Sequence, residues 1–276
     1  MNVHYLKYSP TGNITVLVTS PVPRALQPRV AARLLEADVV GGEQVGFVEP
    51  TAGAAARLQM MGGEFCGNAT MSLGALLCRR AGLSDGDCAT LPLEVSGLDA
   101  PIPCHVRREG EGWTGTVQMP LPTAVERAEL DTDAGPLTVP LVRMPGIAHL
   151  LLPADAAPGE AELRRRLPQW NRAVGADALG ALTWDADASA IDPLVYVPSA
   201  GTLVREHGCG SGSAAVGGWL ALSGGRGLRV PIRQPGGVIT VRADLIDGRL
   251  SALFITGIVT LLDEGDADVD PLPLQP

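Results

Sequence analysis

The sequence predicts a mixed α/β (α+β) fold with two related halves, in each of which strands surround a buried central helix. Short segments with strand-like alternation of apolar and polar residues are spread along the whole chain. Two longer segments, 67–78 and 210–222, contain no charged residue. Since a helix without a polar stripe is buried on every side, each of these segments is expected to form the centre of one half.

The remaining elements follow from the apolar periodicity. We expect strands at 13–19, 44–49, 91–95, 114–119, 137–142, 194–197, 238–243 and 250–262. Amphipathic helices are expected at 27–37 and at 160–170, the second being broken at Pro168. The acidic segment 263–276 is expected to be frayed or to lie on the surface.

Composition excludes several classes of protein. The chain of 276 residues has a net charge of −9 and contains only 4 Trp, 3 Tyr and 3 Phe, whereas nucleic-acid binding needs a positive surface and usually aromatic stacking platforms. The longest uncharged stretch, 208–225, is too rich in glycine for a membrane span. The N-terminus lacks the basic and apolar regions of a signal peptide. We therefore expect a cytoplasmic protein that binds neither nucleic acid nor a membrane.

Neither a cofactor nor a metal is expected. The five cysteines include no CxxC pair, which argues against a zinc site and against a disulfide scaffold. Lys7 is the only lysine of the sequence and lies in the first strand-like segment, a poor place for the Schiff base that pyridoxal phosphate requires. The phosphate-binding motif GxxxxGK[ST] is absent from the sequence.

The two uncharged segments resemble each other in sequence. Each directly follows a cysteine, Cys66 or Cys209, and a second glycine recurs at the same distance from that cysteine, at Gly74 or Gly217. Most positions between them hold small residues. The two cysteines lie about half the chain apart, which indicates a duplicated unit whose central helix presents a thiol in its first turn.

A cysteine at a helix start has a specific chemical use. The first-turn N–H groups have no partner within the helix, and the helix dipole is positive there, so such a thiol is expected to have a lowered pKa. The same N–H groups can bind a substrate carboxylate. Two such helix starts facing each other would let one thiol remove a proton from a carbon while the other returns one on the opposite face. For either cysteine alone, a buried packing residue is the alternative.

The motifs around these cysteines resemble those of the diaminopimelate epimerase superfamily of cofactor-independent racemases and epimerases. The matching stretches are 7–18 (KYSPTGNITVLV), 43–49 (EQVGFVE), 62–72 (GGEFCGNATMS), 209–215 (CGSGSAA) and 234–239 (QPGGVI). They extend over nearly the whole chain. Within the superfamily they are most similar to the histidine racemases that begin the synthesis of staphylopine-type metallophores.

The resemblance implies two pseudo-symmetric lobes, each a β-barrel-like sheet around its central helix. We place the N-terminal lobe at 1–116 and the C-terminal lobe at 117–253, with a strand near 254–263 that can return to the first lobe. The implied partner is a small amino acid substrate, and a homodimer is one possible assembly.

The resemblance also assigns roles to individual residues. Cys66 and Cys209 would be the acid–base pair. The amino acid core of the substrate would be held by Asn13, Gly67, Asn68, Gly210 and Ser211.

Three further residues are open to two interpretations each. Glu206 would orient a thiol or the substrate ammonium, or else serve as a capping or surface carboxylate. His149 would lie near the site or be a structural histidine. Gln59 would contact the substrate or remain an amide on the surface of a strand.

The sequence departs from diaminopimelate epimerases where those enzymes hold the distal end of their substrate. Glu206 is followed by His207 instead of an arginine, Ile147 replaces an asparagine, and 177–184 contains no asparagine. A buried distal head group without partners is costly. We therefore expect diaminopimelate to be rejected, and the resemblance to the histidine racemases implies the interconversion of L- and D-histidine. The alternatives are another amino acid epimerase or racemase, such as one acting on diaminopimelate, a phenazine-biosynthesis-like isomerase, and an amino acid binding protein.

Overall fold

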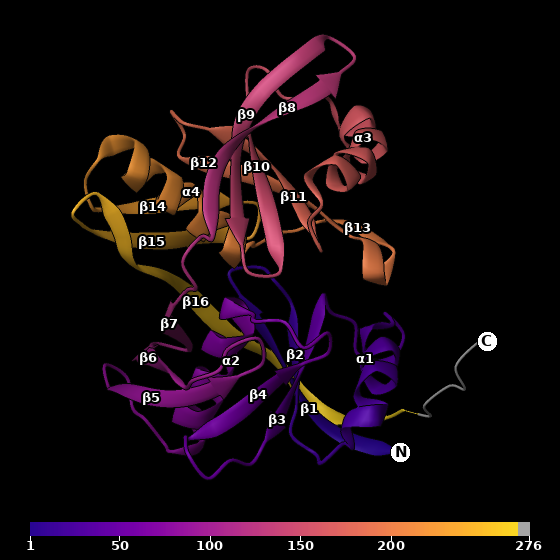
Figure 1. The fold of residues 1–276 in the computed structure, drawn as a ribbon. Coiled ribbons are helices and arrows are strands. Elements are labelled where there is room, and N and C mark those ends of the chain that lie inside the picture. The colour runs from indigo at the N-terminus through magenta and orange to yellow at the C-terminus, as the bar shows by residue number, and fades with distance from the viewer. Residues whose placement is uncertain (270–276) are drawn as a thin grey trace. The chain divides into compact units, whose positions relative to one another are not determined.

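The structure is a computed structural model, and it describes residues 1–269 of the chain. The chain forms two compact units, one of Met1–Gln118 together with the chain from Thr256 onward, the other of Met119–Ile255. Strands dominate both units and helices are few (Figure 1). The predicted mixed α/β class is confirmed.

The first unit is built from strands that close on themselves. Its elements are β1 (Asn2–Pro10), β2 (Thr15–Val18), η1 (Arg24–Leu26), α1 (Gln27–Leu35), β3 (Gln44–Glu49), β4 (Ala56–Met60), α2 (Gly67–Arg80), β5 (Cys88–Val95), β6 (Ile102–Glu109), β7 (Gly112–Gln118) and the later part of β16 (Arg249–Asp268). The strands pair in the order β1-β2-β3-β4-β5-β6-β7-β16, and β16 also pairs with β1. α1 packs on β3, whereas α2 lies against β1, β2, β4, β5, β6 and β7.

α2 is buried because its sequence offers no polar face. All residues from Gly67 to Leu76 are buried, and its charged residues lie in the last turn. Gly74 allows a close approach between the helix and β6, since a Cβ at this position would lie 2.7 Å from Val106 and 2.8 Å from Cys104. The position of α2 fixes where its N-terminal cysteine lies.

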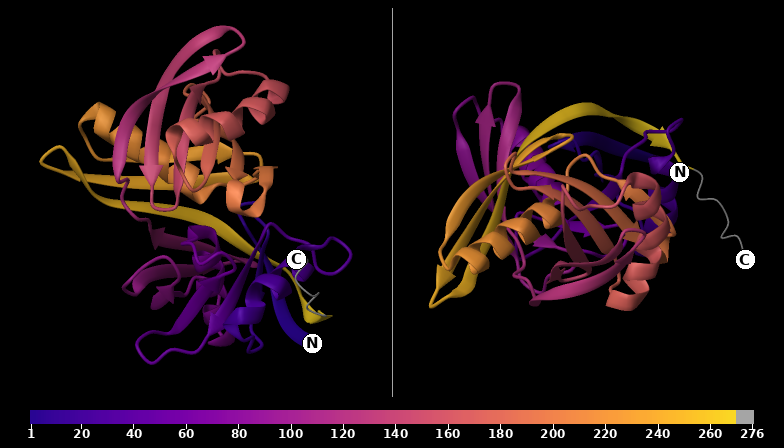
Figure 2. Two further views of the ribbon diagram at one scale, coloured as in Figure 1. Left: turned by 45° about the vertical axis from the view of Figure 1, so that its right-hand side comes forward. Right: turned by 90° about the horizontal axis from the view of Figure 1, so that it is seen from above.

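The second unit is also built mainly of strands, with a few helices. Its elements are β8 (Ala124–Thr132), β9 (Gly135–Met144), β10 (Ile147–Pro153), α3 (Glu160–Val174), β11 (Leu179–Asp185), β12 (Ala190–Val197), η2 (Pro198–Ala200), β13 (Thr202–Arg205), α4 (Gly210–Gly224), β14 (Leu228–Gln234), β15 (Gly237–Ile246) and the beginning of β16. The strands pair in the order β16-β15-β14-β12-β11-β10-β9-β8, with β13 beside β12. α3 packs on β8, β11 and β12, and α4 lies against β9, β10, β14 and β15 (Figure 2).

The acidic segment that was expected to be frayed or on the surface is part of a strand as far as Asp268, so residues 263–268 are not frayed, whereas most of their side chains lie on the surface as expected. Asp263 to Asp268 pair with β1, and the hydroxyl of Tyr5 donates to Asp263 at 2.7 Å. Ala267 is buried against the apolar residues of β1. Alternation of acidic and apolar residues explains the strand, because only one face of it is buried. Residues 270–276 lie outside the described part of the chain.

The expected break at Pro168 was also wrong, because α3 continues through it to Val174. Leu163, Leu167 and Trp170 are buried together in the core of the second unit. These contacts hold both sides of the proline in one helix, although the proline removes one backbone hydrogen bond. The helix ends instead at Gly175, whose φ of 66° is left-handed.

Candidate active site

Cys66 is the N-cap residue of α2. Its backbone is extended (φ −132°, ψ 111°), and its sulfur accepts a hydrogen bond from the backbone N–H of Ala69 at 3.4 Å. The hydroxyl of Thr70 donates to the Cys66 carbonyl at 2.7 Å. These bonds fix the thiol at the end of the helix where backbone N–H groups lack intrahelical partners.

Cys209 has the same position in the second unit. It is the N-cap residue of α4, with φ −100° and ψ 103°, and its sulfur accepts the N–H of Gly212 at 3.3 Å. The hydroxyl of Ser213 donates to the Cys209 carbonyl at 2.9 Å, as the hydroxyl of Thr70 does to that of Cys66. Each unit therefore presents a thiol in one and the same capping geometry.

Gln44, the first residue of β3, holds the Cys66 thiol. Its Oε1 accepts a hydrogen bond from the sulfur at 3.1 Å. Its Nε2 donates to the hydroxyl of Thr15 at 2.8 Å and to the side-chain oxygen of Asn13. Gln44 was not predicted from the sequence as a site residue. The available signal was an amide at the first position of a strand whose next three residues are buried.

Asn13 is brought close to Cys66 through this glutamine. A tight turn places it before β2, with left-handed φ values of 51° at Thr11 and 82° at Gly12, and the N–H of Asn13 donates to the Pro10 carbonyl at 3.1 Å. The Asn13 side chain is buried and donates to Glu43 at 2.7 Å. One hydrogen-bonded chain thus connects Asn13 to the first thiol.

Burial raises the pKa of the Cys209 thiol well above its ordinary value, and the negative charge of Glu206 raises this pKa further. Hydrogen bonds from the Ser211 hydroxyl and the Gly212 N–H act in the opposite direction. The lowered pKa expected from the helix start is therefore wrong for Cys209, because desolvation and a carboxylate outweigh the helix end. At neutral pH this thiol is protonated and can donate its proton.

His149 lies on β10 and is connected to Cys209 through Ser211. Its Nε2 shares a hydrogen bond with the Ser211 hydroxyl at 3.0 Å, and that hydroxyl lies 3.6 Å from the Cys209 sulfur. Burial lowers the pKa of His149 to about 3, so the imidazole is neutral at physiological pH. Gly180 leaves room for the ring, since a Cβ there would collide with it.

The other predicted site residues lie as follows. Gly67 and Asn68 begin α2 and are buried, and Gly210 and Ser211 begin α4, where Gly210 is buried and Ser211 is partly buried. Gln59 lies on β4, where its Nε2 donates to the carbonyl of Met60 at 3.2 Å. The first unit thus combines Cys66 with Asn13, Gly67 and Asn68, and the second combines Cys209 with His149, Glu206, Gly210 and Ser211.

Comparison with known families identifies the family of the chain. A family model described as the histidine racemase CntK N-terminal domain matches residues 2–267. The chain belongs to this family. It is therefore an isomerase of the amino acid racemase type, and the resemblance drawn from the cysteine motifs is confirmed.

Individual relatives match over nearly the full length of the chain. Histidine racemase of Staphylococcus aureus is 28% identical over 276 residues, covering 97% of this chain and 98% of the relative. Histidine racemase of Fusobacterium nucleatum is 28% identical over 95% of this chain and 94% of the relative. A solved structure of a hydroxyproline epimerase from Agrobacterium vitis has a TM-score of 0.72 at 16% identity, covering 98% of this chain and 94% of that one. This last likeness concerns the fold alone.

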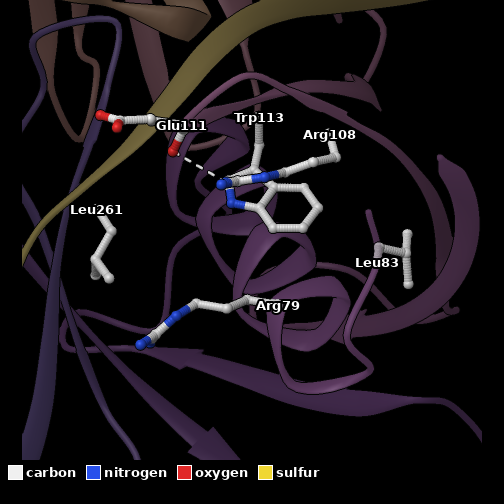
Figure 3. Close-up of a pocket in the computed structure, with 6 residues that line it drawn as sticks. All are labelled: Arg79, Leu83, Arg108, Glu111, Trp113 and Leu261. Atoms are coloured by element: carbon white, nitrogen blue, oxygen red, sulfur yellow. Dashed lines mark hydrogen bonds between the residues drawn. The ribbon is translucent and has the colours of Figure 1, made fainter. Parts of the chain in front are cut away.

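A separate pocket of about 300 Å³ lies at the other end of α2 (Figure 3). It is lined by Arg79, Leu83, Arg108, Glu111, Trp113 and Leu261. Arg79 forms an ion pair with Glu264 at 2.7 Å, and Arg108 lies 4.7 Å from the ring centre of Trp113 and donates to the carbonyl of Glu111 at 2.9 Å. Since Arg79 is roughly 20 Å along the helix from Cys66, this pocket is not part of the thiol site.

Residues 1–269 contain neither a candidate membrane-spanning helix nor a candidate metal site. No helix in that part of the chain is both long and apolar enough to cross a membrane. No group of three or more His, Cys, Asp or Glu side chains with the geometry to hold a metal ion occurs there either.

Proposed function

We propose that the protein interconverts L- and D-histidine by direct proton transfer at the α-carbon, with Cys66 and Cys209 as the acid–base pair and without a cofactor. The observation that carries this proposal is the repeated capping geometry. Each sulfur accepts the N–H of the third helix residue, Ala69 at 3.4 Å in one unit and Gly212 at 3.3 Å in the other. Membership of the histidine racemase family supports the choice of substrate.

The proposed reaction consumes nothing. One thiolate removes the α-proton, the electron pair of the broken C–H bond is delocalised into the substrate carboxylate, and the other thiol delivers a proton to the opposite face. The two sulfurs end with their protonation states exchanged, which prepares the enzyme for the reverse reaction. First-turn N–H groups at Gly67, Asn68, Gly210 and Ser211 would stabilise the negative charge that builds up on the carboxylate.

The surroundings of Cys209 suit a proton donor. Its raised pKa keeps the thiol protonated at neutral pH, and Glu206 beside it would orient the S–H group. Neutral His149 would fix the hydroxyl of Ser211 near the sulfur.

The surroundings of Cys66 suit substrate recognition. Gln44 would hold the thiol in place, and Asn13, hydrogen-bonded to Gln44, would bind the substrate amino group. In this proposal Gln59 contributes to the same substrate region from β4.

The proposal includes the finer architecture and the biological setting. We propose two pseudo-symmetric lobes at 1–116 and 117–253, each a β-barrel-like sheet around its central helix. The additional pairing of β16 with β1 supports this for the first lobe, and it supports the return of the strand near 254–263. Because both thiols have to stay reduced, we propose the cytoplasm as the compartment. An opine-type metallophore is the proposed use of D-histidine.

Chiral chromatography after incubation with single amino acids tests the substrate. The panel contains histidine, alanine, glutamate, lysine and diaminopimelate. We expect racemisation of histidine from either enantiomer and rejection of diaminopimelate, because a distal charged group would be buried without a partner. Turnover of diaminopimelate with histidine untouched would contradict the proposal. Thermal stabilisation by histidine without any racemisation would indicate a binding protein instead.

A further inference from the structure

We propose that Gln234 is the positioning residue for Cys209, holding the backbone of this cysteine so that its thiol meets the α-carbon of the substrate. This inference rests on the proposed function, because it assigns a role within the same reaction. Gln234 is the last residue of β14 and is buried. β14 and β15 lie beside α4 (Figure 1), so the turn between these strands is close to the start of the helix.

Gln234 contacts the backbone of Cys209 directly at its N–H and, through Ser213, at its carbonyl. Its Oε1 accepts the N–H of Cys209 at 2.6 Å. Its Nε2 donates to the hydroxyl of Ser213 at 2.8 Å, and that hydroxyl donates to the Cys209 carbonyl at 2.9 Å. Three hydrogen bonds therefore form a closed ring that runs from the cysteine backbone through the side chains of Gln234 and Ser213 and back.

The helix cannot supply this contact itself. In a capping box, a glutamate or glutamine at the third helix position reaches back to the N–H of the N-cap residue. Here the third position is Gly212, where a Cβ would lie 3.0 Å from the Cys209 sulfur and 3.0 Å from Leu182. A side chain at this position would crowd the thiol, so the acceptor for the Cys209 N–H comes from another strand.

A further hydrogen bond connects the turn between β14 and β15 to the segment that precedes Cys209. The N–H of Gly236 donates to the carbonyl of His207 at 2.7 Å. The β14–β15 turn thus holds the chain on both sides of Gly208, immediately before the N-cap. A shift of this turn would move the sulfur of Cys209 relative to its helix, and proton transfer depends steeply on such a shift.

Replacement of Gln234 by methionine tests the proposal. Gln234→Met keeps the length of the side chain and removes both hydrogen bonds. We expect kcat for histidine racemisation to fall roughly 10- to 100-fold, with KM little changed, since misplacement of a reacting group affects the chemical step. Gln169→Met, at an exposed glutamine on α3 of the same unit, is the matched control and should retain wild-type kinetics.

Isotope effects separate positioning from a general structural role. The measurement compares α-deuterated L-histidine with α-deuterated D-histidine, since Cys209 is the base in one direction of racemisation and Cys66 is the base in the other. If proton transfer at Cys209 is slowed, cleavage of the C–H bond becomes the rate-limiting step in the direction in which Cys209 is the base. The substrate deuterium isotope effect on racemisation by Gln234→Met should therefore be larger than that of the wild type in that direction and smaller in the other. Equal changes in both directions, or wild-type kcat with wild-type isotope effects, would overturn the proposal.

Two further measurements test the proposal if Gln234→Met does not fold or if the protein does not racemise histidine. If Gln234→Met does not fold, Ser213→Ala breaks the same ring with a smaller change and should give the same asymmetry. If the wild-type protein does not racemise histidine, the proposed function fails. The positioning of Cys209 by Gln234 is then tested by iodoacetamide labelling of the wild type and Gln234→Met. Mass spectrometry of labelled peptides should then show an altered rate at Cys209 alone, with Cys66 and the exposed Cys88 unchanged. An unaltered rate at Cys209 would refute positioning.

Discussion

The close packing of α4 predicts that Gly217→Ala destabilises the second unit. A Cβ at position 217 would lie 2.9 Å from the Cβ of Val241 and closer still to one of its methyl groups. Val241 is fully buried in β15 and, being β-branched, has little freedom to turn away. Overpacking of this kind costs about 1–3 kcal/mol, and two contacts below 3 Å place the cost near the upper limit. Alanine regains about 1 kcal/mol of helix propensity, which leaves a net loss of about 2 kcal/mol.

Urea denaturation measures the free energy of unfolding that Gly217→Ala loses. Gly224→Ala, in the same helix, is the matched control for this variant. Position 224 has open space around it, so alanine there should leave the free energy of unfolding unchanged or raise it by up to about 1 kcal/mol. Thermal unfolding of Gly217→Ala should occur roughly 4–8 °C lower than that of the wild type. Equal stability of the two variants would refute the argument that glycine is required for the approach of α4 to β15.

Two further predictions concern the surroundings of the thiols. Because burial lowers the pKa of His149 from 6.5 to about 3, its neutral form stabilises the fold above pH 6.5, and this contribution is lost as the pH falls from 6.5 towards 3. Urea denaturation of the wild type should show the free energy of unfolding fall by about 2 kcal/mol between pH 7.5 and pH 5, and His149→Gln should remove this fall. The same pH dependence of the free energy of unfolding in the variant would contradict the burial argument. Gln44→Met removes the acceptor of the Cys66 thiol and should lower kcat about 10-fold in a chiral assay, whereas wild-type kcat would show that this contact has no part in catalysis.

The sequence was sufficient to find both thiols because the signal is local. A cysteine, a glycine and a run of small residues without charge define a buried helix start within a few positions. The glutamines that hold these cysteines could not be found in this way. Gln44 is 22 residues from Cys66 and Gln234 is 25 residues from Cys209, and strand pairing brings them together.

Other differences between expectation and structure have equally physical causes. β10 and β11 were not predicted, since strands that are buried on both faces lack alternation. The pKa of Cys209 depends on how deeply α4 is buried and on the approach of Glu206, neither of which follows from the helix start alone. The link between Asn13, which was predicted as a substrate-binding residue, and the first thiol could not be predicted, because it depends on Gln44.

The most direct test of the central claim follows the α-hydrogen of histidine in D2O. Proton NMR and chiral chromatography are applied to the wild type, Cys66→Ser and Cys209→Ser, with Cys88→Ser at an exposed thiol as the control. The account predicts that the wild type and the control exchange the α-hydrogen and racemise histidine. Each of the other two variants should lose racemisation by on the order of 10²-fold or more, because serine is a much weaker base than a thiolate. Near-normal racemisation by either Cys66→Ser or Cys209→Ser would contradict the two-thiol mechanism.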